Sequence, residues 1–257
     1  MILSSPHQPS PPVRIISLVP SQTELLHYFG LDEETIAITK FCIHPAPWFQ
    51  NKTRIGGTKA IDIEKIISLQ PDLIIANKEE NVKEQVESLA AHFPVWLTDV
   101  NNLEDAYQMI KDIGQLTFTS DRAKVLIDNI QNEFRELQTL PDPIPVAYLI
   151  WKDPYMTVGG DTFIHDMIEK AGMKNVFGSK KRYPEITISQ IKASGCKMLL
   201  LSSEPYPFAA KHIAELSLQL PGIKIKLVDG EMFSWYGSRL LKAANYFRSF
   251  KSEPVAD

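Results

Sequence analysis

Two segments of the chain, 125 residues apart, carry a similar pattern of residues, and this internal similarity constrains the fold more than any other feature. Residues 61–76 read IDIEKIISLQPDLIIA, and residues 186–201 read ITISQIKASGCKMLLL. In both segments, apolar residues at helical spacing lead into a short apolar run that suits a buried strand. Glu79 and Glu204, in the acidic turns that follow, keep the same offset. The similarity therefore predicts a duplicated α/β unit.

Strands and helices alternate on both sides of this repeat, which implies parallel sheets covered by helices. Ser21 is expected to cap the first helix, with Glu24 completing a capping box. The expected strands are 14–19, 73–76, 95–98, 146–151 and 198–202, and the expected helices are 23–29, 62–69, 81–91, 103–114, 121–140, 163–171 and 188–193. The helix over 121–140 would be roughly 30 Å long at 1.5 Å per residue, long enough to join two lobes.

We therefore expect an α/β fold of two Rossmann-like lobes with mainly parallel sheets, joined by one long bridging helix. The Pro- and Ser-rich residues 1–12 should form a disordered or extended arm. The amino-terminal lobe is predicted over 13–118, the bridging helix over 119–142 and the carboxyl-terminal lobe over 143–257.

Composition excludes several classes of protein. Hydrophobic residues make up 44% and charged residues 23% of the chain, which is typical of soluble globular proteins. The net charge of -4 leaves no basic stripe for nucleic acid. No run of apolar residues is long enough to span a membrane. The first residues lack the basic and apolar regions of a signal peptide, so the protein either stays inside the cell or is a mature or trimmed form.

Open α/β sheets bind ligands at the carboxyl ends of their strands, and the turns that follow the expected strands are rich in aromatic residues. Trp48, Trp151 and Trp235 lie in such turns, whereas Trp96 lies in a strand and suits a core position. Flat rings around an inter-lobe cleft suit a broad, partly apolar ligand such as a corrin, a haem or a catecholate chelate. Packing of the lobe interface is the alternative role. The expected ligand contacts are Phe41, Cys42, His44, Trp48, Trp151, Tyr155, Arg182, Tyr183, Glu185, Phe233, Trp235, Tyr236 and Arg239.

The sequence shows none of the usual catalytic or metal-binding patterns. The six histidines include no pair at helical i, i+4 spacing, and Cys42 and Cys196 match neither a redox nor a metal-ligand spacing. Gly159-Gly160 lacks the rest of a phosphate-binding loop, and no serine stands in a nucleophile elbow. We therefore expect a binding protein without catalytic residues, without a metal site of its own and without a covalently bound cofactor. A cytoplasmic enzyme on a doubly wound fold is the alternative from another class.

Four segments, taken in order, carry a family resemblance. They are RIISLVPSQTELL at 14–26, Gly-Gly at 56–57, IEKIISLQPDLIIA at 63–76 and TVGGDTFIHDMIEKAG at 157–172. Together they resemble the cobalamin-binding and ferric-siderophore-binding proteins of ABC importers, the class with a helical backbone, over Val13 to about Phe250. The resemblance implies two Rossmann-like lobes bridged by one long helix, with limited closure on binding.

The resemblance also implies a ligand and a partner. The ligand would be a corrinoid resembling cobalamin, with a ferric siderophore or a haem as the alternative. An anionic ferric chelate would need cations, which Lys180, Lys181, Arg182 and Arg239 could supply. The partner would be an ABC permease that docks onto an acidic residue of each lobe, and the chain would act as a monomer. The location would be periplasmic or extracytoplasmic, or cytoplasmic if Met1 is the native start. The acidic candidates for docking are Glu79, Glu80 and Glu84 in one lobe and Glu204 in the other.

Overall fold

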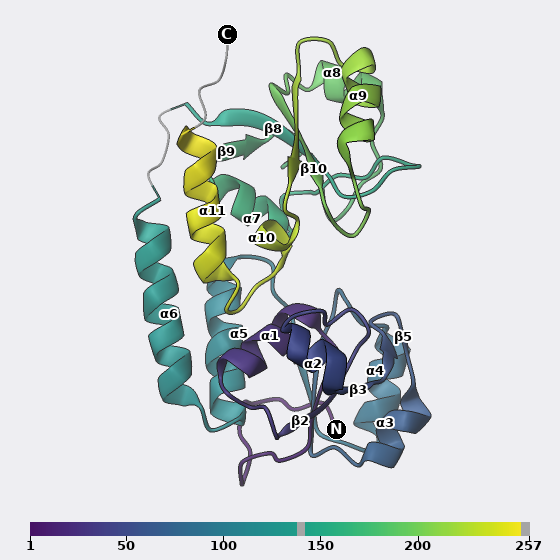
Figure 1. The fold of residues 1–257 in the computed structure, drawn as a ribbon, viewed down its shortest axis with the longest axis vertical. Coiled ribbons are helices and arrows are strands. Elements are labelled where there is room, and N and C mark those ends of the chain that lie inside the picture. The colour runs from purple at the N-terminus through teal and green to yellow at the C-terminus, as the bar shows by residue number, and fades with distance from the viewer. Residues whose placement is uncertain (138–141, 253–257) are drawn as a thin grey trace. The chain divides into compact units, whose positions relative to one another are not determined.

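The computed structural model describes residues 1–137 and 142–252, with side chains up to Arg248 (Figure 1). The chain divides into two units. Unit 1 comprises Met1–Val100, Glu104–Asn129 and Trp235–Arg239, and unit 2 comprises Asn101–Leu103, Ile130–Ser234 and the residues from Leu240 onward. Helix α6 (Ser120–Arg135) passes from unit 1 into unit 2 after Asn129. The last residues of the helix expected over 121–140 lie outside the described residues.

Unit 1 is built on a parallel five-stranded sheet with the order β3-β2-β1-β6-β7. Its strands are β1 (Ile15–Ser17), β2 (Thr35–Ile38), β3 (Thr53–Arg54), β6 (Leu73–Asn77) and β7 (Val95–Thr98). A short antiparallel pair joins β4 (Gly56–Gly57) to β5 (Ala60–Ile61). The helices are α1 (Pro20–Tyr28), α2 (Ala46–Asn51), α3 (Ile63–Leu69), α4 (Lys83–Ala90) and α5 (Leu103–Leu116), and α3 lies beside α4 in Figure 1.

Unit 2 is built on a parallel four-stranded sheet with the order β11-β10-β8-β9. Its strands are β8 (Ile144–Leu149), β9 (Met173–Asn175), β10 (Met198–Ser202) and β11 (Lys224–Val228). Its helices are α7 (Phe163–Lys170), α8 (Ile188–Ala193), α9 (Ala210–Gln219), α10 (Glu231–Ser234) and α11 (Leu240–Ser252). Leu149, Leu199 and Leu201 form the centre of a buried apolar cluster in this unit. The predicted α/β class with mainly parallel sheets is confirmed.

The internal repeat appears in both units at the offset expected from the sequence. Helices α3 and α8 begin at Ile63 and Ile188, and strands β6 and β10 begin at Leu73 and Met198. Each helix is capped in the same way: Asp62 accepts a hydrogen bond from the Lys65 amide, and Thr187 accepts one from the Gln190 amide. Both strands are buried along their whole length. Burial on both faces explains why these two strands are continuous apolar runs.

The first helix begins differently from the sequence prediction. Helix α1 starts at Pro20, with Val19 at the N-cap position and no side-chain cap. Proline is well tolerated in the first turn because its missing N–H would have no partner in the helix. The predicted capping box of Ser21 and Glu24 is therefore wrong. Ser21 lies inside the first turn, and Glu24 pairs with Arg239 instead.

The amino-terminal residues, for which we expect a disordered or extended arm, are held at their start by β7. Ile2 forms a parallel bridge with Val95, and the Leu3 amide donates to the Val95 carbonyl at 2.9 Å. The Val95 amide in turn donates to the Met1 carbonyl at 2.9 Å. The start of the arm thus extends the pairing at the β7 edge of the unit 1 sheet.

Candidate ligand-binding site

The carboxyl edge of the unit 1 sheet is a buried polar surface. Strands β1, β6 and β7 end at Ser17, Asn77 and Thr98, and all three residues are buried. The Asn77 amide donates to the Thr98 hydroxyl at 3.1 Å, and this hydroxyl donates to the Ala76 carbonyl at 2.9 Å. Most buried polar groups in native proteins have a hydrogen-bond partner. The edge at which open α/β sheets bind ligands is therefore lined with ordered polar side chains.

Cys42 belongs to this polar surface and has no exposed area. Thr23 donates to its sulfur at 3.1 Å, and the Thr39 hydroxyl lies 3.1 Å from the same atom. Burial raises the pKa of the Cys42 thiol to about 11, although the two threonine hydrogen bonds oppose the rise. The thiol is therefore protonated at neutral pH and is a poor nucleophile or metal ligand.

A loop from near the carboxyl end of the chain, Trp235–Arg239, belongs to unit 1. The Trp235 ring meets the ring of His44 edge-on, with centroids 5.6 Å apart, and the Arg239 guanidinium lies 4.8 Å from the centroid of the Trp235 ring. Tyr236 donates to Glu80 at 3.3 Å. Five of the expected ligand-contacting or docking residues are thus brought together at one edge of one sheet by a segment far away in sequence.

Arg239 makes a two-pronged ion pair with Glu24 on α1. Its Nε and Nη2 atoms donate to the two carboxylate oxygens, each at 2.9 Å. The side chains are 6% and 13% exposed, so the pair is shielded from solvent. The positive charge of Arg239 is therefore balanced within the protein. Sequence reasoning missed Glu24 in this role because it assigned the residue to a helix cap.

Two other unit 1 candidates, Phe41 and Trp48, differ from each other in solvent exposure. Phe41 is 51% exposed, and the Lys40 ammonium lies 5.2 Å from the centroid of its ring. Trp48 is only 3% exposed, meets His27 edge-on at 5.3 Å and donates its indole N–H to Asp32. Trp48 thus fills the interior beside α1, whereas Phe41 presents a ring to solvent.

In unit 2, an irregular ladder after β8 gathers several candidates. Trp151 bridges Met156, and Met156 bridges Glu185, both in antiparallel fashion. The Ile186 amide donates to the Tyr155 carbonyl at 2.9 Å, and burial raises the pKa of the Tyr155 phenol. Trp151 keeps 41% of its surface exposed, and its ring meets that of Tyr206 at 5.7 Å. The ladder therefore presents one large ring to solvent.

The same ladder continues into an exposed basic loop. The Gly159 amide donates to the Arg182 carbonyl at 2.7 Å, and the Arg182 amide donates to the Asp161 carboxylate at 2.6 Å. A Cβ atom on Gly159 would lie 2.5 Å from the Lys180 carbonyl oxygen, so the close approach of the two segments requires glycine. The Arg182 guanidinium is exposed and lies 5.5 Å from the centroid of the half-buried Tyr183 ring.

Phe233 is buried, whereas the four acidic candidates for docking are half-buried or exposed. Phe233 has no exposed surface and packs against Tyr148 and Phe247, with ring centroids 5.2 and 4.9 Å away, so it fills the unit 2 core. Glu204 is half-buried and accepts a hydrogen bond from Ser234 at 2.6 Å. Glu79 and Glu80 are also half-buried, and Glu84 is exposed in the first turn of α4. Of the four, Glu84 is the carboxylate most open to a partner.

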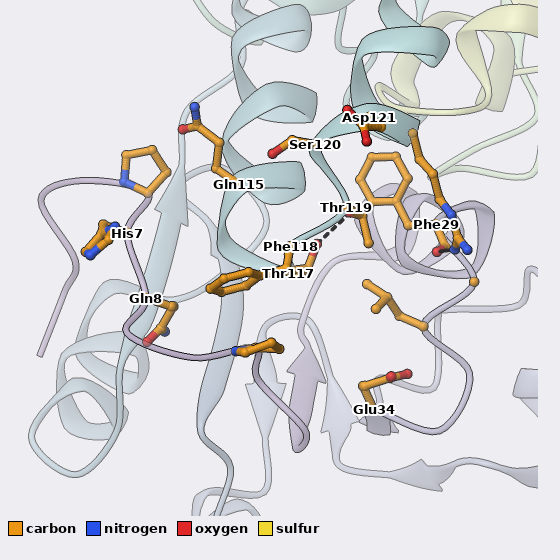
Figure 2. Close-up of a pocket in the computed structure, with 15 residues that line it drawn as sticks. His7, Gln8, Phe29, Glu34, Gln115, Thr117, Phe118, Thr119, Ser120 and Asp121 are labelled. Atoms are coloured by element: carbon orange, nitrogen blue, oxygen red, sulfur yellow. Dashed lines mark hydrogen bonds between the residues drawn. The ribbon is translucent and has the colours of Figure 1, made fainter.

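A separate hollow of about 960 Å³ lies in unit 1, at the turn between α5 and α6 (Figure 2). Its lining comes from the amino-terminal arm, the segment after α1 and the turn itself, in which the Thr117 and Thr119 hydroxyls are 2.8 Å apart. Phe29 and Glu34 place it near the end of α1 and the start of β2. It therefore lies away from the carboxyl ends of the strands, where the candidate site is.

Within residues 1–137 and 142–252, no helix is long and apolar enough to cross a membrane. In the same described part, no three His, Cys, Asp or Glu side chains are grouped so that they could hold a metal ion.

Comparison with known proteins decides the family. The model of the periplasmic binding protein family matches residues 15–216, which is most of the chain. The chain belongs to this family. The resemblance found in the sequence is thereby confirmed.

Several known proteins are similar to this chain over most of its length. The vitamin B12-binding protein of Vibrio vulnificus (strain CMCP6) is 28% identical over 199 residues, which cover 74% of this chain and 71% of that protein. A solved structure of a possible iron-binding (periplasmic solute-binding) protein from Staphylococcus epidermidis is 25% identical and has a TM-score of 0.79, covering 95% of this chain and 100% of the other. The periplasmic heme-binding protein HutB of Vibrio cholerae is 20% identical and shares the fold with a TM-score of 0.81, covering 94% and 99%.

Proposed function

We propose that this chain is the solute-binding component of an ABC importer and that its ligand is a corrinoid. The observation that carries the choice of ligand is the Glu24–Arg239 pair. At the carboxyl edge of the unit 1 sheet, the half-buried ring of His44 packs against the buried ring of Trp235, and the arginine beside them is already neutralised by Glu24. Such a surface suits a broad, largely uncharged ligand better than a polyanionic chelate. The similarity to vitamin B12-binding proteins supports the same choice.

A titration with cyanocobalamin tests the proposal. We expect heat release and a change in the corrin absorbance at micromolar ligand, together with a higher melting temperature, because a ligand that binds only the folded state stabilises it. Replacing His44 by Ala should weaken binding about 2- to 10-fold, since it removes one ring from the cluster. His92→Ala is the matched control, because His92 is exposed and meets only Phe93 in the ring contacts described. Absence of any heat, absorbance change or melting shift would refute corrinoid binding.

A ferric siderophore or a haem is the second candidate ligand, and one observation favours it. Lys181 and Arg182 are exposed in the basic loop of unit 2, beside the half-buried Lys180. Such a loop suits the carboxylates of a haem or the charge of a ferric catecholate. Hemin and a ferric catecholate should each bind more weakly than cyanocobalamin. If either binds more tightly and Arg182→Gln abolishes its binding, the ferric-chelate alternative replaces the corrinoid.

We propose an extracytoplasmic location and a permease that docks onto acidic residues, with Glu84 the most accessible of the four carboxylates. Membership of a family of binding proteins supports a role without catalysis. Cell fractionation separates this proposal from a cytoplasmic enzyme, since the enzyme would be recovered with the soluble cytoplasmic fraction.

A further inference from the structure

Three buried polar atoms near the start of α1 have no hydrogen-bond partner among the described residues. They are the hydroxyl oxygens of Ser21 and Ser238 and the side-chain carbonyl oxygen of Gln22. The three residues are 2%, 8% and 0% exposed. Native proteins leave few buried polar atoms unsatisfied, so three of them near one helix turn call for a partner from outside the described residues, either water or a bound ligand.

Ser21 and Ser238 lie on the same small surface. Ser21, Glu24 and Leu25 share one face of α1 because they are spaced three and four residues apart. The loop residues on either side of Ser238 both contact this face. Arg239 pairs with Glu24, and a Cβ atom on Gly237 would lie 3.4 Å from the Leu25 Cβ and 3.5 Å from the Ser21 carbonyl oxygen. Ser238 is therefore held against the first turn of α1.

The unpartnered groups in the first turn of α1 require both a donor and an acceptor from a bound group. The Gln22 amide nitrogen donates to the Thr98 hydroxyl at 2.6 Å, and Thr98 donates onward to the Ala76 carbonyl. The free oxygen of Gln22 can therefore only accept a hydrogen bond. In contrast, the first turn of α1 lacks a side-chain cap, and the first N–H groups of a helix are donors without partners in the helix. A carboxylate satisfies the donors but not Gln22, whereas a carboxamide satisfies both.

We propose that Ser21, Gln22 and Ser238 form a subsite for an uncharged carboxamide of the ligand. This inference rests on the proposed function and sharpens it, because corrinoids such as cobalamin carry carboxamide side chains around the ring, whereas haem carries carboxylates. The three atoms are shielded from solvent, so a carboxamide bound to them would be shielded as well. The subsite would select the amidated form of the ligand over its acid form.

The test compares Ser21→Ala and Ser238→Ala with the wild-type protein in titrations with cyanocobalamin. Each change should weaken binding about 3- to 10-fold, the effect of losing one uncharged hydrogen bond. The melting temperature of the unliganded protein should not fall, because each hydroxyl removed has no hydrogen-bond partner among the described residues. Ser217→Ala is the matched control, since Ser217 is exposed on α9 in unit 2. It should change neither quantity.

A second titration tests whether the subsite recognises a carboxamide rather than another polar group. A corrinoid whose side-chain amides have been hydrolysed to carboxylates should bind the wild-type protein at least about 10-fold more weakly than cyanocobalamin. The two serine variants should lose part of this discrimination.

The outcomes distinguish this subsite from the proposed function. If the wild-type protein binds cyanocobalamin and both serine variants bind it equally well, the subsite is refuted and the function stands. Unchanged affinity together with a lower melting temperature would assign the hydroxyls to folding and would also refute the subsite. A wild-type protein that does not bind cyanocobalamin overturns the function and the subsite together.

Discussion

The ion pair between Glu24 and Arg239 offers a sharp test of how the Trp235–Arg239 loop is held. Arg239→Met removes the cation and leaves the Glu24 carboxylate, which is only 13% exposed, without its partner. Glu24→Gln leaves the guanidinium of Arg239, which is 6% exposed, in the same position. Loss of one member of a buried pair costs about 3–5 kcal/mol, because the other charge stays desolvated and uncompensated.

The double variant should behave differently from either single one. Replacing both charges by uncharged groups of similar size is often close to neutral, because the desolvation cost of the charges disappears together with their attraction. We therefore expect Glu24→Gln with Arg239→Met to recover most of the stability that Arg239→Met loses. A coupling free energy of about 2 kcal/mol or more is expected from the cycle of variants.

Urea denaturation followed by circular dichroism measures these differences, with thermal melting as a second readout. A loss of about 3–5 kcal/mol corresponds to a fall of roughly 6–20 °C in a protein of this size. The Lys78–Asp99 pair provides the matched control, because its side chains are 57% and 42% exposed. Lys78→Met should cost less than about 1 kcal/mol. If Arg239→Met costs no more than this control, the reasoning about burial is refuted.

Two further predictions concern the thiol and the tryptophans. Since burial raises the pKa of Cys42 to about 11 from 9.0, the folded protein should react with iodoacetamide at about pH 8 far more slowly than the urea-unfolded chain, and rapid modification of Cys42 in the folded protein would contradict this. The folded state holds this proton more tightly than the unfolded state, so its contribution to stability is present below about pH 9 and is lost as the pH rises through about 11, which pH-dependent urea denaturation of Cys42→Ser and wild-type protein can detect. Trp151→Ala, at a ring that is 41% exposed, should weaken cyanocobalamin binding about 2- to 10-fold without loss of stability. Trp48→Ala should instead cost about 3–5 kcal/mol of stability and leave affinity unchanged, and the reverse pattern in titration and denaturation would contradict the placement of these two rings.

The central elements were predictable because their signals are local and strong. Strand β10 matches its predicted bounds, and helix α8 does as well, since a fully apolar run and a capped helical period identify them. Strands β2, β3, β9 and β11 were not predicted. Of these, β3 and β9 have only two and three residues, and such short segments become strands only through the partner beside them.

The candidate site was predictable in part. Trp235 and Tyr236 were expected near the ligand because they lie in an aromatic turn, and Arg239 because it could supply a cation, yet the sequence contains no local sign that they belong to unit 1. Arg239 meets Glu24 across 215 residues of sequence. Trp48 and Trp151 were both expected to contact the ligand, and both lie in turns that are similar in sequence character, yet their exposed fractions are 3% and 41%. Whether a ring is sealed or open depends on neighbours such as His27 and Tyr206, which no local pattern specifies.

The sequence by itself determined the α/β class, the repeat at a spacing of 125 residues and the family, because hydrophobic period and helix caps act over a few residues and recur in order along the chain. Only the tertiary structure decided that Arg239 is neutralised, that Cys42 is a buried thiol and that the side-chain oxygens of Ser21, Gln22 and Ser238 have no hydrogen-bond partner among the described residues. Charge compensation, desolvation and hydrogen-bond satisfaction depend on which distant segments come within a few ångströms of one another, and that information exists only once the chain has folded.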